Sequence, residues 1–245
     1  MTELVVDEER YLHLVPGDLR EVGVLTEPLT VAEKGLAQVW QIQQRLPWID
    51  PNAPVQMRGK GLKAIVLGAG PVGLLGAMVL VAAGFETYVY SRSKVPNPKA
   101  DLVEAIGGNY ISSETTSVEQ LAEQVGTIDL GFEAAGASQV VFDVMRVLGT
   151  NAIFVFAGVP DHKAPIKVDA ALLIRDHVLK NQAVLGSVNA DRADFEAAIR
   201  DLNVFKQRWP QALRSLITGY YPIEQAPQLL LGNTGGIKNV VTFTS

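Results

Sequence analysis

The sequence contains no cysteine, which excludes disulfide bonds and thiolate metal ligands. It has only three histidines, His13, His162 and His177, and no two of them have the short spacing of zinc-binding pairs. We therefore expect no self-contained zinc site in these residues.

Runs of basic residues are also missing, and the net charge is −5. We therefore expect neither nucleic acid nor an anionic membrane surface as a partner. The longest apolar segment, near residues 74–83, is too short to span a bilayer, and the first residues lack the basic and apolar regions of a signal peptide. With 48% hydrophobic residues in 245, the chain can bury one large core or two modest ones, and a cytoplasmic location is expected.

Short apolar runs alternate with longer segments of helical period between residues 62 and 190. This order predicts an α/β fold of the doubly wound, Rossmann type, with a parallel sheet and helices on both faces. The predicted strands are Lys63–Leu67, Glu86–Tyr90, Asn109–Ile111, Ile128–Glu133, Ala152–Phe156 and Ala183–Gly186. The predicted helices are Pro71–Ala83, Pro98–Ile106, Val118–Gln124, Ser138–Leu148 and Ala170–Leu179.

The flanks of this domain follow a different pattern. Residues 1–46 are expected to hold two short strands, Glu3–Val6 and Tyr11–Val15, and a connecting helix, Leu29–Leu46. Residues 47–61, rich in proline and polar side chains, are expected to be a linker, and residues 191–245 to hold C-terminal helices and a return strand. The helices are predicted near Asp191–Phe205, Pro210–Leu216 and Ile223–Leu230, and the strand at Ile237–Phe243.

A glycine-rich turn, Gly68-Ala-Gly70-Pro71-Val72-Gly73, joins the first predicted strand to a long apolar helix. In a dinucleotide-binding turn the first glycine makes the bend, the second lets the backbone approach the pyrophosphate, and the third packs the helix on the strand. Pro71 suits the first helical turn, where a missing N–H costs least. The glycines could also serve packing alone, but the strand-turn-helix context favours a cofactor site.

The end of the second predicted strand distinguishes NADP from NAD. It reads Ser91-Arg92-Ser93-Lys94 and carries no carboxylate for the ribose hydroxyls, because Glu86 stands at the other end of the strand. Arg92 could bind a 2′-phosphate with Ser91 and Ser93 as further donors, so NADP is favoured over NAD. The alternative is that Arg92 and Lys94 are an ordinary solvated pair.

Several motifs together resemble the glucose 1-dehydrogenases, the sugar-oxidising branch of the zinc-dependent medium-chain dehydrogenases. The motifs are the glycine turn, Ser91-Arg92-Ser93, Phe132-Glu-Ala-Ala-Gly136, Phe156-Ala-Gly-Val-Pro160, Leu185-Gly-Ser-Val-Asn-Ala190 and Thr26-Glu-Pro-Leu-Thr-Val-Ala-Glu-Lys34. The likeness runs from about residue 3 to the C-terminus and corresponds to the later part of such an enzyme. The short flanking strands are therefore expected to be remnants of a catalytic domain that is mostly absent.

The resemblance implies hydride transfer from C1 of an aldose to NADP once the fold is complete, with a small sugar or alcohol as substrate. It implies that Glu27 is the metal carboxylate from this side of the cleft, although a lone glutamate at a helix start is more often a partner of the helix dipole. Zinc is expected only if a catalytic domain is supplied. It also implies that the nicotinamide pocket is lined by Ala135, Gly136, Gly158, Val159, Ser187 and Asn189.

Two alternatives from different classes remain open at this point. The chain could belong to an NADP-dependent sugar dehydrogenase, or it could be a non-catalytic module or subunit that binds or senses NADP(H). Strands left without their domain would have unpaired edges, so we expect a homodimer or a partner chain. The exposed apolar face is expected near Val5, Leu12, Leu14 and Val240.

Overall fold

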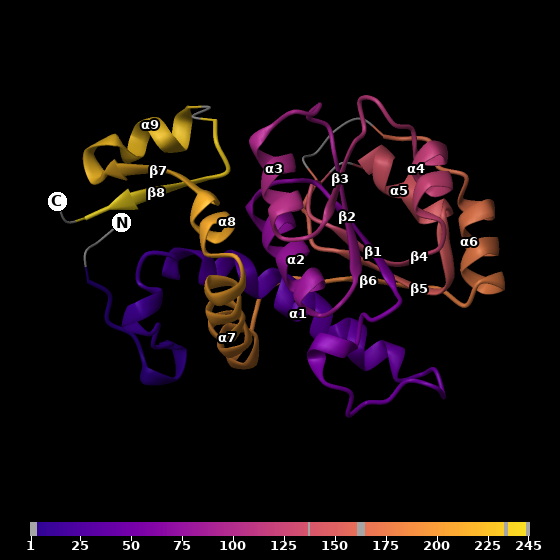
Figure 1. The fold of residues 1–245 in the computed structure, drawn as a ribbon, viewed down its shortest axis with the longest axis horizontal. Coiled ribbons are helices and arrows are strands. Elements are labelled where there is room, and N and C mark those ends of the chain that lie inside the picture. The colour runs from indigo at the N-terminus through magenta and orange to yellow at the C-terminus, as the bar shows by residue number, and fades with distance from the viewer. Residues whose placement is uncertain (1–3, 137, 161–164, 233–234, 244–245) are drawn as a thin grey trace. The chain divides into compact units, whose positions relative to one another are not determined.

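The computed structural model of the chain describes residues 4–136, 138–160, 165–232 and 235–243 (Figure 1). The chain divides into two compact units. One unit is Val31–Asn189, and the other combines Met1–Thr30 with Ala190–Ser245.

The unit Val31–Asn189 contains a six-stranded parallel sheet with the order β3-β2-β1-β4-β5-β6. The order reverses between β1 and β4, so the sheet is doubly wound and of the Rossmann type, as the sequence predicts. Its strands are β1 Lys63–Leu67, β2 Glu86–Ser91, β3 Asn109–Ser112, β4 Ile128–Glu133, β5 Leu148–Phe156 and β6 Ala183–Gly186. Its helices after the connecting helix are α2 Pro71–Ala82, α3 Pro98–Ala105, α4 Val118–Val125, α5 Ser138–Arg146 and α6 Ala170–Leu179.

The predicted elements of this unit are confirmed, with one strand longer than expected. Strand β5 begins at Leu148 rather than at Ala152, and its pairing with β4 shifts register between Ile128 and Leu130. Asn151 takes a positive φ of 62° at this irregularity, which asparagine tolerates better than most residues. Apolar periodicity alone does not report such a shift, so the sequence predicts only the regular half of the strand.

Helices cover both faces of the sheet, as Figure 1 shows. On one face, side chains of α4, α5 and α6 form a buried cluster with Ile65, Tyr88 and Phe154 of the sheet. On the other face, Gly35 of the connecting helix and Gly76 of α2 lie against the ring of Phe132, where an added Cβ would come within 3.2 Å and 2.8 Å of ring carbons. The absence of side chains at these two positions lets both helices pack closely.

The connecting helix α1 spans Thr26–Gln43, three residues earlier at each end than the predicted Leu29–Leu46. The early start follows from Pro28, which is tolerated in a first helical turn because the N–H there has no helical acceptor. The end follows from Leu46, whose backbone N–H bonds the Gln43 carbonyl in a turn at 3.0 Å. Short 3-10 turns occur at η1 Glu9–Tyr11, η2 Gly17–Leu19, η3 Gly23–Leu25, η4 Val55–Met57 and η5 Ile223–Gln225.

The second unit differs from the prediction in two strands that are absent from the described residues and in one strand that was not expected. Residues 4–15 form no strand and contain only the turn η1, so the strands predicted at 3–6 and 11–15 are wrong for the residues that are described. A strand is stable only with a hydrogen-bonding partner, and alternation of apolar residues does not supply one. A strand that the sequence did not predict, β7 Ile217–Pro222, instead pairs in parallel with β8 Lys238–Thr242, because Gly219 and Pro222 mask its strand pattern.

The helices of this unit follow the sequence more closely. They are α7 Arg192–Arg208, α8 Pro210–Ser215 and α9 Ala226–Leu231, with η5 preceding α9. Asp191 begins α7 with a capping box, in which its side chain accepts from the backbone of Ala193 and Asp194. Of the predicted apolar face, Val5, Leu12 and Leu14 are exposed, whereas Val240 in β8 is half-buried.

The register of the large sheet aligns the carboxyl ends of its strands. Leu67 of β1 pairs with Tyr90 of β2 and Glu133 of β4, Glu133 pairs with Phe156 of β5, and Phe156 pairs with Gly186 of β6. The loops that follow these strands must therefore leave the sheet at one edge, where open α/β sheets bind ligands. Among the described residues, no helix is long and apolar enough to cross a membrane.

Candidate functional site

The glycine turn lies at this carboxyl edge, between β1 and α2. Gly68 has a φ of +100°, and a Cβ there would lie 2.9 Å from the Cβ of Ala135 in the loop after β4. A Cβ on Gly73 would lie 2.2 Å from the carbonyl oxygen of Gly68. Both positions therefore require glycine, one for backbone conformation and close approach, the other for packing of α2 on the turn.

Gly70 has a different role from its two neighbours. It stands just before α2, and a Cβ on it would meet no described atom within 4 Å. In the part of the chain that the structure describes, no side chain caps α2, although Asn97, Ser117 and Asp191 cap α3, α4 and α7. The first backbone N–H groups of α2, beginning after Pro71 with Val72 and Gly73, are thus left for a ligand, and the dipole of the helix favours an anion there.

A cavity of about 420 Å³ adjoins this turn. Two cationic side chains, Arg92 after β2 and Lys99 in the first turn of α3, line it, and no carboxylate does among the residues that the structure describes. The other lining residues are Leu67, Gly68, Ala69, Gly70, Tyr90, Ser91, Ser113, Ala134, Ala135, Gly136 and Val140. The cavity therefore combines a positive charge, hydroxyl groups and an exposed glycine backbone.

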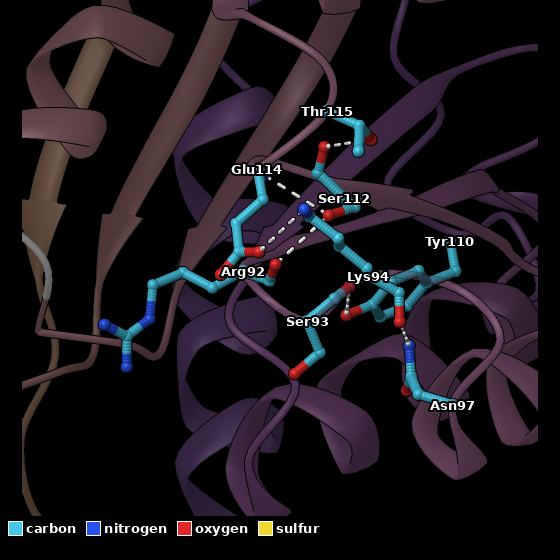
Figure 2. A network of polar contacts seen from close by, with 8 residues as sticks. All are labelled: Arg92, Ser93, Lys94, Asn97, Tyr110, Ser112, Glu114 and Thr115. Atoms are coloured by element: carbon cyan, nitrogen blue, oxygen red, sulfur yellow. Dashed lines mark hydrogen bonds and ion pairs between the residues drawn. The ribbon is translucent and has the colours of Figure 1, made fainter.

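The two cations of the 91–94 segment behave differently, as Figure 2 shows. The Lys94 ammonium lies 3.9 Å from a carboxylate oxygen of Glu114, whereas the Arg92 side chain extends away from this cluster and no dashed line reaches its guanidinium. The Arg92 carbonyl oxygen accepts from the Ser112 hydroxyl at 3.1 Å. The hypothesis of a solvated pair thus describes Lys94, while the anchored backbone of Arg92 presents its side chain to the cavity.

The remaining predicted residues of this segment also separate. Ser91 lines the cavity, but Ser93 does not, and its carbonyl oxygen instead accepts from the Tyr110 hydroxyl at 2.9 Å. Glu86 stands at the far end of β2, where its carboxylate accepts from the Tyr88 hydroxyl and lies 3.9 Å from the Lys63 ammonium. Burial and the Glu86 carboxylate raise the pKa of Tyr88 to about 12. Glu86 therefore takes part in a structural cluster remote from the cavity.

A buried glutamate holds the loops after β4 and β5 together. Glu133, the last residue of β4, is 1% exposed, and one of its carboxylate oxygens accepts from the backbone N–H of Ala135 at 2.7 Å and of Gly136 at 2.6 Å. The other oxygen accepts from the N–H of Gly158, in the loop after β5, at 3.2 Å. Three backbone donors thus satisfy a carboxylate that would otherwise be costly to bury.

A second cavity, of about 430 Å³, follows these loops along the edge. Four predicted residues, Gly158, Val159, Ser187 and Asn189, line it together with Val31, Phe156, Ala157, Gly186 and Val188. The two cavities adjoin where Gly136 meets Val159, since a Cβ on Gly136 would lie 2.9 Å from the Val159 carbonyl oxygen. Lys34 of α1 donates to the Val188 carbonyl oxygen at 2.8 Å and so fixes the loop after β6.

The one predicted metal ligand, Glu27, belongs to no group of metal-binding side chains among the residues that the structure describes. Glu27 is exposed in the first turn of α1, and Thr30 donates its hydroxyl proton to the Glu27 carbonyl oxygen at 2.6 Å. Within the described ranges, no group of three or more histidine, cysteine, aspartate or glutamate side chains could hold a metal ion. The donors present therefore do not fit zinc, which takes three or four protein ligands.

Three residues of the site were not predicted as such. Glu133 belongs to the motif Phe132-Glu-Ala-Ala-Gly136, but the role of its side chain depends on where its strand ends in the sheet, which the motif does not report. Lys99 follows Pro98 at a helix start, which is a signal of helix initiation and not of binding. Lys34 lies six residues after Pro28 on a helix surface, and nothing in the sequence indicates that it reaches residue 188.

The fold and the site define a dinucleotide-binding domain of the Rossmann class. Residues 20–243 match the family described as glucose dehydrogenase C-terminus, and the chain belongs to that family. It is 32% identical over 241 residues to the glucose 1-dehydrogenase of Methanocella arvoryzae, and 36% identical over 217 residues to glucose 1-dehydrogenase 1 of Caldivirga maquilingensis.

A solved structure agrees with this assignment. The structure of Haloferax mediterranei glucose dehydrogenase in complex with NADP, Zn and gluconolactone is 30% identical, with a TM-score of 0.81 over 97% of this chain. The chain covers 63% of that protein. The match with the Methanocella enzyme includes 98% of this chain and 64% of that enzyme. The match with the Caldivirga enzyme includes 88% of this chain and 57% of that enzyme. The chain thus spans about three fifths of the length of these relatives.

We expect Glu133→Gln to lower the free energy of unfolding by about 1.5–3 kcal/mol, because an amide presents an NH₂ group to backbone N–H donors that need acceptors. Urea unfolding followed by circular dichroism measures this. Glu114→Gln is the matched control, because Glu114 is exposed and its carboxylate lies 3.9 Å from the Lys94 ammonium. This substitution should change the free energy of unfolding by no more than about 0.5 kcal/mol. Equal stability of the two variants would contradict the role given to Glu133.

Proposed function

We propose that residues 62–190 bind NADP(H) across the two adjoining cavities, as the cofactor half of an aldose dehydrogenase. The observation that carries the proposal is that Arg92 and Lys99 both line one cavity, which no described carboxylate lines. The cavity lies beside the start of α2, which no described side chain caps. An extra phosphate on the ribose suits two cations, whereas the bare ribose hydroxyls of NAD suit a carboxylate.

Each part of the cofactor has a matching part of the site. The pyrophosphate would lie over Gly70 at the start of α2, where a side chain is absent and backbone N–H groups are free of side-chain caps. The adenosine end with its 2′-phosphate would reach Arg92, Lys99 and Ser91. The nicotinamide would occupy the second cavity, where Ser187 and the Asn189 amide can bond its carboxamide.

The chemistry that the bound cofactor supplies is acceptance of a hydride at its nicotinamide ring. This chain's contribution is positional. Glu133 fixes the loops that carry Gly136 and Gly158, and Lys34 fixes the loop that carries Asn189, so three loops form one rigid wall for the ring. The donor is proposed to be C1 of an aldose, by analogy with relatives named glucose 1-dehydrogenase.

We expect Arg92→Ala to weaken NADPH binding about 10–100-fold and to leave NADH binding nearly unchanged, because only NADPH carries the phosphate that the guanidinium would bind. Calorimetric titration of the purified chain with both dinucleotides measures this. The matched control is Lys94→Ala, because the Lys94 side chain is exposed and pairs with Glu114. Equal losses for NADPH and NADH, or for both variants, would contradict the assignment of the 2′-phosphate to Arg92.

We expect the 245-residue chain to bind NADP without reducing it when glucose and zinc are added. The described residues assemble no group of ligands for a metal ion, and it is the metal ion that would lower the pKa of a sugar hydroxyl. Absorbance of NADPH measures this on the same sample used for the titration. Turnover would mean that catalytic residues lie within this chain. It would also favour Glu27 as a metal ligand and not only as a partner of the helix dipole. Binding without turnover also remains compatible with a module that senses NADP(H).

We further propose that two copies associate through the open edge of the sheet at β6. Among the described residues β6 pairs with β5 alone, and apolar side chains are exposed both on β6 and on α6, the helix that precedes it. They are Ile174, Val178 and Leu179 of α6 and Val184 of β6. An unpaired edge beside exposed apolar side chains is typical of an interaction surface, and a second copy of the same edge would complement it.

We expect Val184→Lys combined with Val178→Lys to convert a dimer into a monomer, because two desolvated ammonium groups would face each other across the edge. Sedimentation velocity at tens of micromolar measures the mass. Leu230→Lys, at an equally exposed apolar position of α9, is the control and should stay dimeric. A monomeric parent chain would contradict the proposal outright, and a dimer that survives the double change would place the interface elsewhere.

A further inference from the structure

A third cavity lies near the amino ends of the strands of the same sheet, at the end opposite to the glycine turn. Its volume is about 200 Å³, and its lining includes Leu62 and Phe85, which directly precede β1 and β2, and Leu130, the third residue of β4. Leu62 lies five residues before Leu67 in the chain, Phe85 lies five before Tyr90, the register partner of Leu67, and Leu130 lies three before Glu133, its other register partner. The cavity is therefore separate from the proposed cofactor site.

Aromatic rings form the walls of this cavity. The rings of Trp40 and Phe85 stack with their centroids 5.8 Å apart and an interplanar angle of 23°. The Arg58 guanidinium lies over the Trp40 ring, 5.6 Å from its centroid. Trp48 also lines the cavity but remains 67% exposed, which leaves a large aromatic face in contact with water. Flat walls of this kind favour a flat occupant.

Two polar groups face the same space with bonding capacity left over. One carboxylate oxygen of Asp129 accepts from the Lys63 backbone N–H at 2.8 Å, while its other oxygen accepts from no group that the described residues supply. The Asp129 side chain is half-buried, and this burial raises the pKa of its carboxyl group. Arg58 donates its Nε–H to the Ala53 carbonyl oxygen at 3.1 Å, and across the described chain its two terminal nitrogens have no hydrogen-bond acceptor.

We propose that this cavity binds a planar heteroaromatic molecule of bicyclic size that carries an N–H donor on one edge. The ring stacks against the exposed ring of Trp48 and packs beside the Trp40–Phe85 pair, and its N–H donates to the unused carboxylate oxygen of Asp129. The size follows from the volume, because cavities for larger, drug-sized ligands usually begin at about 300 Å³. The donor follows from Asp129, since a half-buried carboxylate oxygen gains most from a charge-assisted hydrogen bond.

Packing of aromatic side chains without any ligand is the competing explanation. It predicts that a probe would bind weakly and without regard to its polar edge, because apolar contact alone does not discriminate N–H from N–CH₃. The two explanations therefore differ in the effect of one methyl group on the probe and of one oxygen in the protein. Both effects can be measured on the intact chain.

The test uses benzimidazole and 1-methylbenzimidazole, which share a ring system but differ in the N–H donor. Two-dimensional NMR of the ¹⁵N-labelled chain resolves the indole N–H signals of its three tryptophans. Trp40 and Trp48 line the cavity, whereas Trp209 follows α7 in the other unit and serves as an internal reference. We expect saturable shifts of the first two signals with benzimidazole, and binding at least about tenfold weaker with the methylated probe.

Asp129→Asn should weaken benzimidazole binding about tenfold and largely remove the difference between the two probes, because the negative acceptor is lost. Asp169→Asn is the matched control, since asparagine caps α6 as aspartate does. Trp48→Ala provides a second variant whose exposed position leaves the fold intact, and it should also weaken binding. The circular dichroism spectrum, compared with that of the parent chain, verifies that each variant is folded.

Equal affinity for the two probes, or full affinity in both the Asp129 and Trp48 variants, would overturn the proposal and favour packing alone. Shifts that fail to saturate at millimolar probe would overturn it as well. The result does not depend on the cofactor assignment, because loss of NADPH binding in the parent chain would leave these titrations interpretable.

Discussion

The buried carboxylate of Glu133 is the interaction on which the candidate site depends. Its two oxygens accept from the backbone of Ala135, Gly136 and Gly158, so the loops after two neighbouring strands share one anchor. Gly136 in turn contacts Val159 and sits close to the turn at Gly68 through Ala135. Without this anchor, the loops would need to satisfy their own donors and the wall between the two cavities would lose its shape.

The sheet makes this anchor possible through its register. Leu67, Glu133, Phe156 and Gly186 lie in one row across four strands, so every following loop starts from the same line. Buried parallel strands with helices on both faces are held in register by packing on each side. The loops at this edge therefore start from a fixed row, while the charge of the cavity comes from Arg92 and Lys99, which the loop after β2 and α3 carry.

The two ends of the sheet serve different purposes. At the carboxyl edge, backbone donors and cations face a space suited to a phosphorylated dinucleotide. At the amino edge, the end of α1 and residues 47–61 surround an aromatic cavity with Asp129 and Arg58. Residues 47–61, expected as a linker, thus carry hydrogen-bonded turns such as η4 and contribute Trp48 and Met57 to a defined surface.

The local sequence was enough to predict the doubly wound domain. The alternation of short apolar runs with segments of helical period indicates its strands and helices, and Gly68, Gly70 and Gly73 mark the turn after the first strand. Gly68 needs a conformation that glycine allows, and at Gly73 the backbone has no room for a side chain. The local sequence also located Arg92 and the loops at residues 135, 158 and 187. It failed at residues 4–15 and at β7, because a strand depends on a partner elsewhere in the chain. Only the tertiary structure decided that Glu133 anchors two loops, that Lys99 joins Arg92 and that Lys34 reaches Val188, since each depends on distance in space.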